Sequence, residues 1–327
     1  MRTVPSQQRL LNEFQHGFPL VAEPFADMAT QIGVTVQSLL AQLRTFQQQH
    51  IISRVGPVFR PNTIGVSTLA AMSVPEAGLE KVAAMISRYP QVNHNYEREH
   101  AYNLWFVLND SDSASLEHTL ACMSRQTGHP ILSLPLVKAY HIDLGFDLET
   151  GTKKKQTGPC QHAHTPHTAL PEDYKPLIKA TQKGLPLTER PYLAIAKKLK
   201  RTEQSVIAQL ATLLQEGIIK RMGVIVQHRK LGFLANGMVV FDIPDTMVDA
   251  IAYELSAEPR ISLCYQRPRR EPHWPYNLFC MIHGKSRQEV LEHVTDLRHR
   301  HNLSEIPQDI LFSKKCFKQR GATYRYG

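Results

Sequence analysis

Histidine, arginine and aromatic residues are concentrated in two short segments of this chain, residues 94–106 and 264–279. Alternate side chains of a β-strand share one face, so the even-numbered residues from His94 to His100 should line up, as should Tyr265 and Arg267. Arginine binds carboxylates through paired hydrogen bonds, and aromatic rings cover flat ligands. The two segments therefore indicate a site for a flat aromatic ligand with several carboxylates, unless these residues only fill sheet faces and cap loops.

The two segments belong to a longer internal repeat. Residues 51–56 recur 167 positions later as residues 218–223, and the same offset relates residues 17–20 to 184–187. The offset grows to 169 between Tyr96 and Tyr265, and to 174 between Tyr102 and Tyr276, so the second segment contains five extra residues. A period near 160 residues is a domain duplication, because it is too long for a solenoid repeat.

The first part of each copy is predicted to form three short helices and one strand. Apolar residues at helical spacing predict helices around Leu10 to Phe14, from Glu23 to Ile32 with Gly33 as its end, and from Val36 to Gln48. Residues 51–59 alternate like the wing strand of a winged helix. The second copy repeats the pattern at residues 174–183, 190–200, 202–215 and 218–226. This is a winged helix-turn-helix pattern.

The second part of each copy is predicted to have the strand and helix order βαββαβ of a ferredoxin-like domain. In the first copy these elements are residues 63–74, 76–89, 92–98, 102–109, 116–125 and 131–144; in the second they are 234–243, 245–255, 261–267, 276–283, 287–299 and 309–317. The fold class is therefore α+β, a tandem duplication of a winged helix-turn-helix domain followed by a ferredoxin-like domain. The expected boundaries are 1–60 and 61–148 for the first copy, 149–171 for a linker, and 172–228 and 229–327 for the second copy.

Length and composition suit this organisation. A chain of 327 residues is long enough for roughly two to three domains. No apolar run approaches the roughly 20 residues that cross a bilayer, and the N-terminus has no apolar signal-peptide region, so we expect a cytoplasmic protein without a membrane segment. The five cysteines form no C-x-x-C pair and are expected to be reduced thiols.

The net charge of +9 is unevenly divided between the copies. Residues 1–150 contain ten Lys and Arg against thirteen Asp and Glu, near −3, which leaves about +12 for the rest of the chain. This basic excess could attract any polyanion. A duplicated DNA-binding protein should be basic in both copies, and a recognition helix should offer several basic or amide side chains. Residues 36–48 contain several glutamines but one basic residue, Arg44, and residues 202–215 contain no basic residue, so we do not expect DNA as a partner.

The region between the copies has a different composition. Residues 149–171 contain a lysine run, three prolines and two glycines, which indicates an exposed linker. Its Cys160, His162, His164 and His167 are metal-ligand types, but a linker lacks fixed geometry and supporting hydrogen bonds, so no metal site is expected.

The order of elements resembles a known architecture. Helix-turn-helix, wing and βαββαβ are similar to the leucine-responsive, asparagine-type regulators, whose effector domain is ferredoxin-like. The segment from His94 to Tyr96, with Tyr102 to Phe106, looks like the siroheme decarboxylases, which occur as two homologous subunits or as one fused chain. The chain resembles the fused form over nearly its whole length. The resemblance implies a carboxy-lyase that removes carbon dioxide from two acetate side chains of siroheme, giving didecarboxysiroheme for haem d1 or for an alternative haem route.

The resemblance implies siroheme as substrate and no required organic cofactor. Decarboxylation of an acetate on a pyrrole leaves a carbon that must be protonated, and histidine suits the role of general acid. The expected catalytic residues are His94, His100 and His273, one of which could instead ligate the iron. The expected substrate-binding residues are Tyr96, Arg98, Tyr102, Trp105, Tyr265, Arg267, Arg269, Arg270, Trp274 and Tyr276.

The two copies differ within these segments. Leu263 and Cys264 stand at the positions of His94 and Asn95, so we expect one catalytic site and one degenerate site. The two halves should pair through their sheets as an internal pseudo-dimer, and a homo-oligomer is possible. The alternatives are a DNA-binding regulator that senses a tetrapyrrole or an amino acid, and a haem carrier that binds without turnover.

Overall fold

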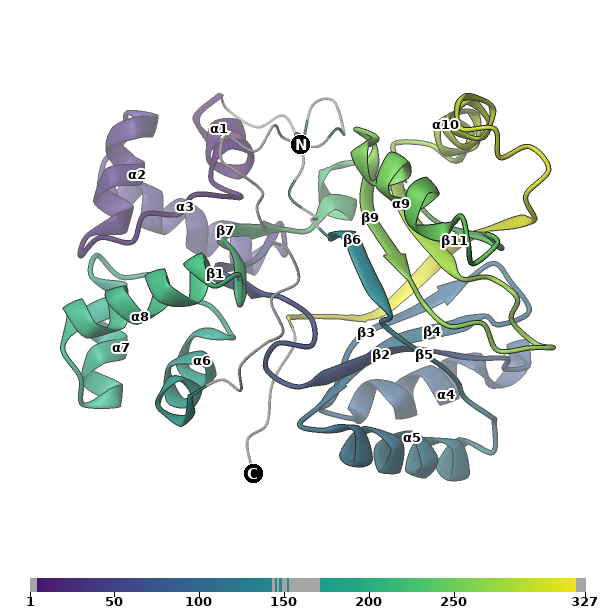
Figure 1. Ribbon diagram of the computed structural model, residues 1–327. Helices are drawn as coiled ribbons and strands as arrows, with labels where there is room; N and C mark the ends of the chain where they lie inside the picture. The colour runs from purple at the N-terminus through teal and green to yellow at the C-terminus, as the bar shows by residue number, and fades with distance from the viewer. Residues whose placement is uncertain (1–4, 143–144, 146, 149–151, 153–170, 322–327) are drawn as a thin grey trace. The chain divides into compact units, whose positions relative to one another are not determined.

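The computed structural model describes residues 5–142, 145, 147–148, 152 and 171–321, which form two compact units (Figure 1). The first unit contains residues 5–65 and 171–231, and the second contains residues 66–152 and 232–321. Each unit thus collects the equivalent parts of both copies. The lysine run and the Cys160 to His167 segment of the predicted linker lie outside the described residues.

The first unit consists of two sets of three helices that follow the predicted order. The first copy forms α1 (Pro5–Glu13), α2 (Pro24–Ile32), α3 (Val36–Gln48) and β1 (Ile52–Phe59). The second forms η1 (Glu172–Tyr174), α6 (Lys175–Thr181), α7 (Pro191–Leu199), α8 (Glu203–Gln215), β7 (Ile219–Val226) and η2 (His228–Leu231). Gly33 ends α2 in the left-handed conformation, as predicted, and Thr35 accepts a hydrogen bond from the Ser38 amide to start α3.

The strand after the third helix finds its partner in the other copy. β1 and β7 pair antiparallel with each other, with Gly56 opposite Gly223, and form a two-stranded sheet. The prediction of a wing strand is confirmed, but no wing hairpin forms within either module, because the backbone groups of each strand are satisfied by its equivalent. Glycine is required at 223, since a Cβ there would lie 2.1 Å from the backbone oxygen of Gln15.

The second unit contains both predicted ferredoxin-like domains. The first copy forms β2 (Val66–Met72), α4 (Glu76–Arg88), β3 (Val92–Arg98), β4 (Leu104–Asp110), α5 (Ser113–Thr127), β5 (Leu132–Pro135) and β6 (Lys138–Ile142). The second forms β8 (Ala235–Phe241), α9 (Val248–Ala257), β9 (Ile261–Gln266), β10 (Leu278–Gly284), α10 (Arg287–Arg300) and β11 (Gln308–Gln319). Within the copies the strand orders are β5-β2-β4-β3 and β11-β8-β10-β9, the order expected for the ferredoxin-like fold.

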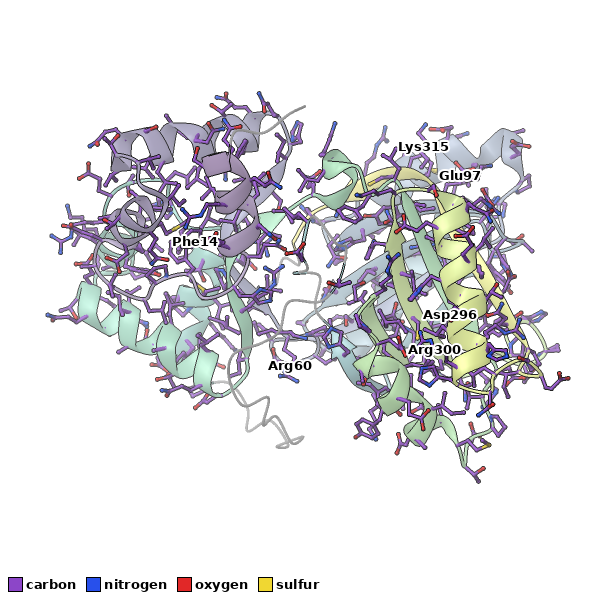
Figure 2. All side chains as sticks on the ribbon, turned by 90° about the horizontal axis from the view of Figure 1, so that it is seen from above. Phe14, Arg60, Glu97, Asp296, Arg300 and Lys315 are labelled. Carbon is purple, nitrogen blue, oxygen red and sulfur yellow. The ribbon has the colours of Figure 1, made fainter. Side chains whose placement is uncertain are left out.

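The two copies share one nine-stranded sheet, β5-β2-β4-β3-β11-β8-β10-β9-β6. β11 joins the halves: residues 308–312 pair with β8, and residues 313–319 pair with β3 of the first copy. Figure 2 labels Glu97 of β3 and Lys315 of β11 at this junction. β5 and β6 lie at opposite ends of this order, yet only two residues separate them in the sequence. The sheet must therefore curl until its two ends meet.

One prediction for this sheet was wrong. Residues 131–144 were expected to form a single last strand, but the chain forms β5, which pairs with β2, and then β6, which pairs with β9 of the second copy. Pro135 ends β5 and has no N–H to continue a ladder, so the chain changes partner after it. The same crossing occurs without a break in β11, which has no proline.

The curled sheet separates three hydrophobic cores. One lies under α4 and α5 of the first copy and a second lies under α9 and α10 of the second copy, with the helices outside (Figure 1). The third lies on the opposite, inner face and contains residues of both copies, including Leu69 and Trp105 from the first and Met238, Trp274 and Phe279 from the second. The expected internal pseudo-dimer is therefore present, with its interface on the sheet.

Within the described residues, no helix is long and apolar enough to cross a membrane, and no group of side chains has the composition of a metal site. No disulfide joins the four cysteines in this part of the chain, Cys122, Cys264, Cys280 and Cys316.

Candidate functional site

The two sequence segments form equivalent strand connections in the second unit. In the first copy, the backbone N–H of Arg98 donates to the oxygen of Asn103 at 2.8 Å and closes the turn between β3 and β4. In the second, Arg267 donates to Asn277 at 2.9 Å and closes the longer loop between β9 and β10. The five extra residues of the second copy therefore enlarge one loop without changing the strands on either side of it.

Both connections are fastened by an asparagine that sequence analysis did not single out for this role. The amide of Asn103 donates to Val74 O at 2.8 Å and accepts from Val74 N at 3.0 Å, and Asn277 makes the same two bonds with Ile243 at 2.8 and 2.9 Å. Each side-chain amide thus bonds the backbone N–H and carbonyl of a residue just beyond a strand, Val74 after β2 and Ile243 after β8, in place of a neighbouring strand. The repeated Tyr-Asn-Leu sequence was the available signal, because it stands in both copies.

Aromatic residues of both copies meet around Trp274 on the inner face of the sheet. The Trp274 ring centroid lies 5.1 Å from those of Trp105 and Tyr276, 5.4 Å from His100 and 6.1 Å from Tyr102. Trp274 is fully buried, and within the described part of the chain its indole nitrogen has no hydrogen-bond partner, whereas Trp105 Nε1 donates to Tyr102 O at 2.6 Å. Five of the predicted site residues are therefore brought together, and they come from both segments.

His100 lies at the edge of this aromatic cluster, in the turn beyond β3. Its Nδ1 accepts a hydrogen bond from the backbone N–H of Tyr102 at 2.8 Å, and its Nε2 lies 3.6 Å from a carboxylate oxygen of Asp309. Burial lowers the pKa of His100 below its usual value, and the charge of Asp309 opposes that shift. Asp309 belongs to β11 and was not identified from the sequence.

The other two predicted histidines lie elsewhere. His94 is half-buried on β3, where its ring stacks on Tyr96 with centroids 6.3 Å apart. It stands four positions before Arg98, which ends the same strand, a distance of about 13 Å at the usual rise of a strand. His273 is exposed, in the loop before Trp274. The structure thus places only His100 in contact with the aromatic cluster that joins the two copies.

Arg98 and Arg267 occupy equivalent positions, the first buried and the second partly buried. The guanidinium of Arg98 donates to Leu311 O on β11 at 2.8 Å and lies over the Tyr96 ring, and that of Arg267 donates to Leu134 O on β5 and lies over the Tyr265 ring. Burial lowers the pKa of Arg267. Arg98 therefore fastens β11 and Arg267 fastens β5, each through a hydrogen bond to the backbone of the other copy.

The remaining predicted arginines are also engaged. Arg269 pairs with Asp242 at 2.8 Å and with Asp245 at 2.5 Å, and Arg270 donates to Ser133 O at 3.0 Å. In the basic tail, Lys314 pairs with Glu97 and Lys315 pairs with Glu80. Much of the basic excess of the second copy thus holds the two copies together or orders a loop, so less of it is available to a ligand than the sequence suggested.

Two family models match the chain. A model of the AsnC-like ligand binding domain matches residues 63–141 and 230–318, and a model of the siroheme decarboxylase NirDL-like HTH domain matches residues 7–52 and 174–220. The siroheme decarboxylase NirDL subunit of Paracoccus denitrificans is 42% identical over 96% of both chains. The chain belongs to the siroheme decarboxylase family.

Further relatives agree with membership of the siroheme decarboxylase family. The siroheme decarboxylase of Hydrogenobacter thermophilus is 31% identical over 95% of this chain and 92% of its own length. The crystal structure of a siroheme decarboxylase NirDL in complex with an iron-uroporphyrin III analogue is 28% identical, has a TM-score of 0.69, and covers 98% of this chain and 93% of that chain. The duplication is therefore the fused form of the family, as the sequence indicated.

Several polar side chains on the helices that a DNA-binding regulator would use are hydrogen-bonded to other parts of this chain. On α3, Gln37 donates to Glu189 at 2.8 Å, Arg44 donates to Leu187 O at 2.7 Å, and Gln42 accepts from Gln7. On α8, Gln209 is bonded to Arg201 and Asp173. These are four of the amide and basic side chains that could read bases. The decarboxylase assignment is therefore favoured over the regulator alternative.

Proposed function

We propose that this chain decarboxylates siroheme at the inner face of the curled sheet, where the two copies meet. The observation that carries the proposal is the contact of His100, from the first segment, with Trp274, from the second, beside Tyr102, Trp105 and Tyr276. This arrangement joins a titratable group to the aromatic surface that a flat tetrapyrrole requires. Its relatives are named for the same activity.

The reaction converts an acetate side chain and one proton into a methyl group and carbon dioxide. The carbon–carbon bond to the carboxylate breaks, its electron pair passes into the pyrrole and the conjugated ring, and the side-chain carbon is then protonated. The protein has to orient the acetate, remove water from around it and supply the proton. We propose two such reactions per siroheme, giving didecarboxysiroheme for haem d1 or an alternative haem, with no organic cofactor.

The proposed roles follow the surroundings of each side chain. His100 is the residue at the reacting acetate, because it lies at the aromatic cluster; His94 is a second candidate for the proton donor, and His273 is a third. Arg269 and Arg270 are the more exposed arginines and would meet substrate carboxylates by exchanging their present partners. Arg98 and Arg267, which are already bonded to backbone carbonyls, would act on the substrate chiefly through Tyr96 and Tyr265, over whose rings they lie.

The decisive experiment is anaerobic incubation of the full chain with siroheme, followed by mass spectrometry of the tetrapyrrole. We expect the loss of two carbon dioxide units. His100→Ala should lower kcat by roughly 10²- to 10⁴-fold, the usual contribution of acid–base catalysis. His94→Ala and His273→Ala, measured in parallel, separate the three candidates.

A matched control is His293→Ala, since His293 lies on α10 outside both segments. Binding of siroheme without a change of mass would contradict the proposal and favour a haem carrier. Full activity in all three candidate variants would contradict acid catalysis by these histidines while leaving the decarboxylase activity established. Further oligomerisation and cytoplasmic location stay predictions.

A further inference from the structure

His100 is held by partners on both sides of its ring. The Tyr102 N–H lies 2.8 Å from Nδ1, and the Asp309 carboxylate lies 3.6 Å from Nε2. The Trp274 ring stands edge-on at 5.4 Å and the Tyr102 ring stacks at 6.1 Å. The ring plane is therefore restricted by aromatic neighbours, and each nitrogen faces a different kind of group.

These partners select one tautomer of the imidazole. A ring nitrogen that accepts a hydrogen bond carries no proton, so in the neutral ring the Tyr102 N–H places the proton on Nε2. A carboxylate beside Nε2 favours the same state, because it accepts from an N–H and repels a lone pair. Nε2 could bind a metal only after losing this proton, which would move the proton to Nδ1 and break the Tyr102 bond.

The Asp309 carboxylate is itself oriented. Its Oδ1 accepts a hydrogen bond from the Ile310 N–H at 2.6 Å, which leaves Oδ2 toward His100. Asp309 stands on β11 opposite Val240, so its backbone is fixed by the second copy while His100 belongs to the first. The pair thus forms only when the two copies share one sheet.

The duplication supplies an internal comparison. Arg98 binds the carbonyl of Leu311 and Arg267 binds that of Leu134, so the last strands are equivalent at an offset of 177. At that offset Asp309 corresponds to Leu132, which packs against the inner core. The fold therefore accepts an apolar side chain at this position, and the carboxylate of Asp309 needs a reason beyond packing.

Other titratable and charged groups near the pair come from the surrounding elements. Tyr276 lies near Asp309 and Asp242, and burial, together with these carboxylates, raises its pKa. Asp242 is paired with Arg269. Glu99, next to His100 in the chain, is paired with Arg287 of α10. Asp309 is thus the carboxylate that faces His100 directly.

We propose that Asp309 is a positioning residue for His100. With the Tyr102 N–H it holds the ring as the Nε2–H tautomer, so that His100 meets the substrate as an N–H donor to a carboxylate and not as a ligand of the iron. The role of His100 as an N–H donor to the substrate rests on the proposed function, whereas its tautomer is a property of the free protein.

The first test is nitrogen-15 NMR of the histidine rings in the full chain, with His100→Gln used to assign the signal. We expect the wild type to show His100 with the proton on Nε2, and Asp309→Asn to titrate at lower pH because an opposing charge is lost. Asp296→Asn is the control, since it removes the same charge from α10, where Asp296 pairs with Arg300 (Figure 2). Asp309→Glu should restore the wild-type titration in part. An Nδ1–H tautomer, or unchanged titration in Asp309→Asn, would overturn the proposal.

The second test uses turnover and the absorption spectrum of bound iron-uroporphyrin. Asp309→Asn should lower kcat by roughly 10- to 100-fold with little change in KM, the size expected for a misplaced group. The spectrum should be the same in wild type and His100→Gln; loss of a histidine-ligated spectrum in that variant would refute the donor role. If the wild type itself does not decarboxylate siroheme, the proposed function fails, and the NMR result still decides the role of Asp309.

Discussion

The two tryptophans of this chain offer a matched pair of substitutions. Both are buried in the inner core with ring centroids 5.1 Å apart, but Trp105 Nε1 donates to Tyr102 O at 2.6 Å, and Trp274 Nε1 has no partner within the described residues. Replacement by phenylalanine removes a similar volume at both sites. The difference between the two variants therefore isolates the indole hydrogen bond.

The expected magnitude follows from these contacts. Trp105→Phe leaves the Tyr102 carbonyl without its donor, at a cost of about 1–3 kcal/mol beyond the loss of packing. Trp274→Phe removes a buried N–H that is already unpaired, which relieves a penalty of similar size and offsets part of its lost packing. Trp105→Phe should thus be the more destabilising by roughly 2 kcal/mol or more.

Urea unfolding followed by fluorescence measures this difference directly, because each variant retains one tryptophan and both tryptophans lie in the second unit. The transition of that unit is compared between the variants, with circular dichroism as the probe for the wild type. Equal stability, or a less stable Trp274→Phe, would refute the reasoning. If Trp274 Nε1 donates to the substrate, Trp274→Phe should also raise KM while Trp105→Phe leaves it near the wild-type value.

Other parts of the structure give three further predictions. Asn277→Ala should destabilise the second unit by roughly 1–3 kcal/mol in urea unfolding, because it orphans the buried N–H of Ile243, whose carbonyl keeps its hydrogen bond from Arg269. Asn103→Ala should cost less because that amide is only partly buried, and equal effects would contradict this. Burial and the nearby Arg98 lower the pKa of His283 to about 4, so on acidification the unfolded chain binds this proton before the folded chain does. The free energy of unfolding, which is fully retained above pH 6.5, should therefore fall by roughly 3 kcal/mol toward pH 4. His283→Gln should flatten that loss, and an unchanged pH dependence in this variant would count against the argument. The full chain should bind random DNA duplexes no more tightly than about 10⁻⁶ M in a gel-shift assay at physiological salt, and tight binding to any one sequence would revive the regulator alternative.

Local sequence determined most of the individual elements. The helix from Val36 to Gln48 and the strand from Val92 to Arg98 have the predicted bounds, because apolar periodicity, Gly33 and the capping Thr35 act within a few residues. The repeat itself implied two equivalent halves and located the inserted loop. It also identified both chemical segments, since residue type and alternation are visible without the fold.

Tertiary structure decided the partners. Nothing local in residues 131–144 or 308–319 states that a strand will cross to the other copy, because an edge strand offers the same unpaired backbone groups to any neighbour. That crossing makes Arg98 and Arg267 fasten strands, brings His100 against Trp274, and places Asp309 beside His100. The sequence by itself therefore determined which residue types are available for the chemistry. Only the shared sheet decided which of them meet, since contacts between the copies depend on strand pairing between residues more than 120 positions apart.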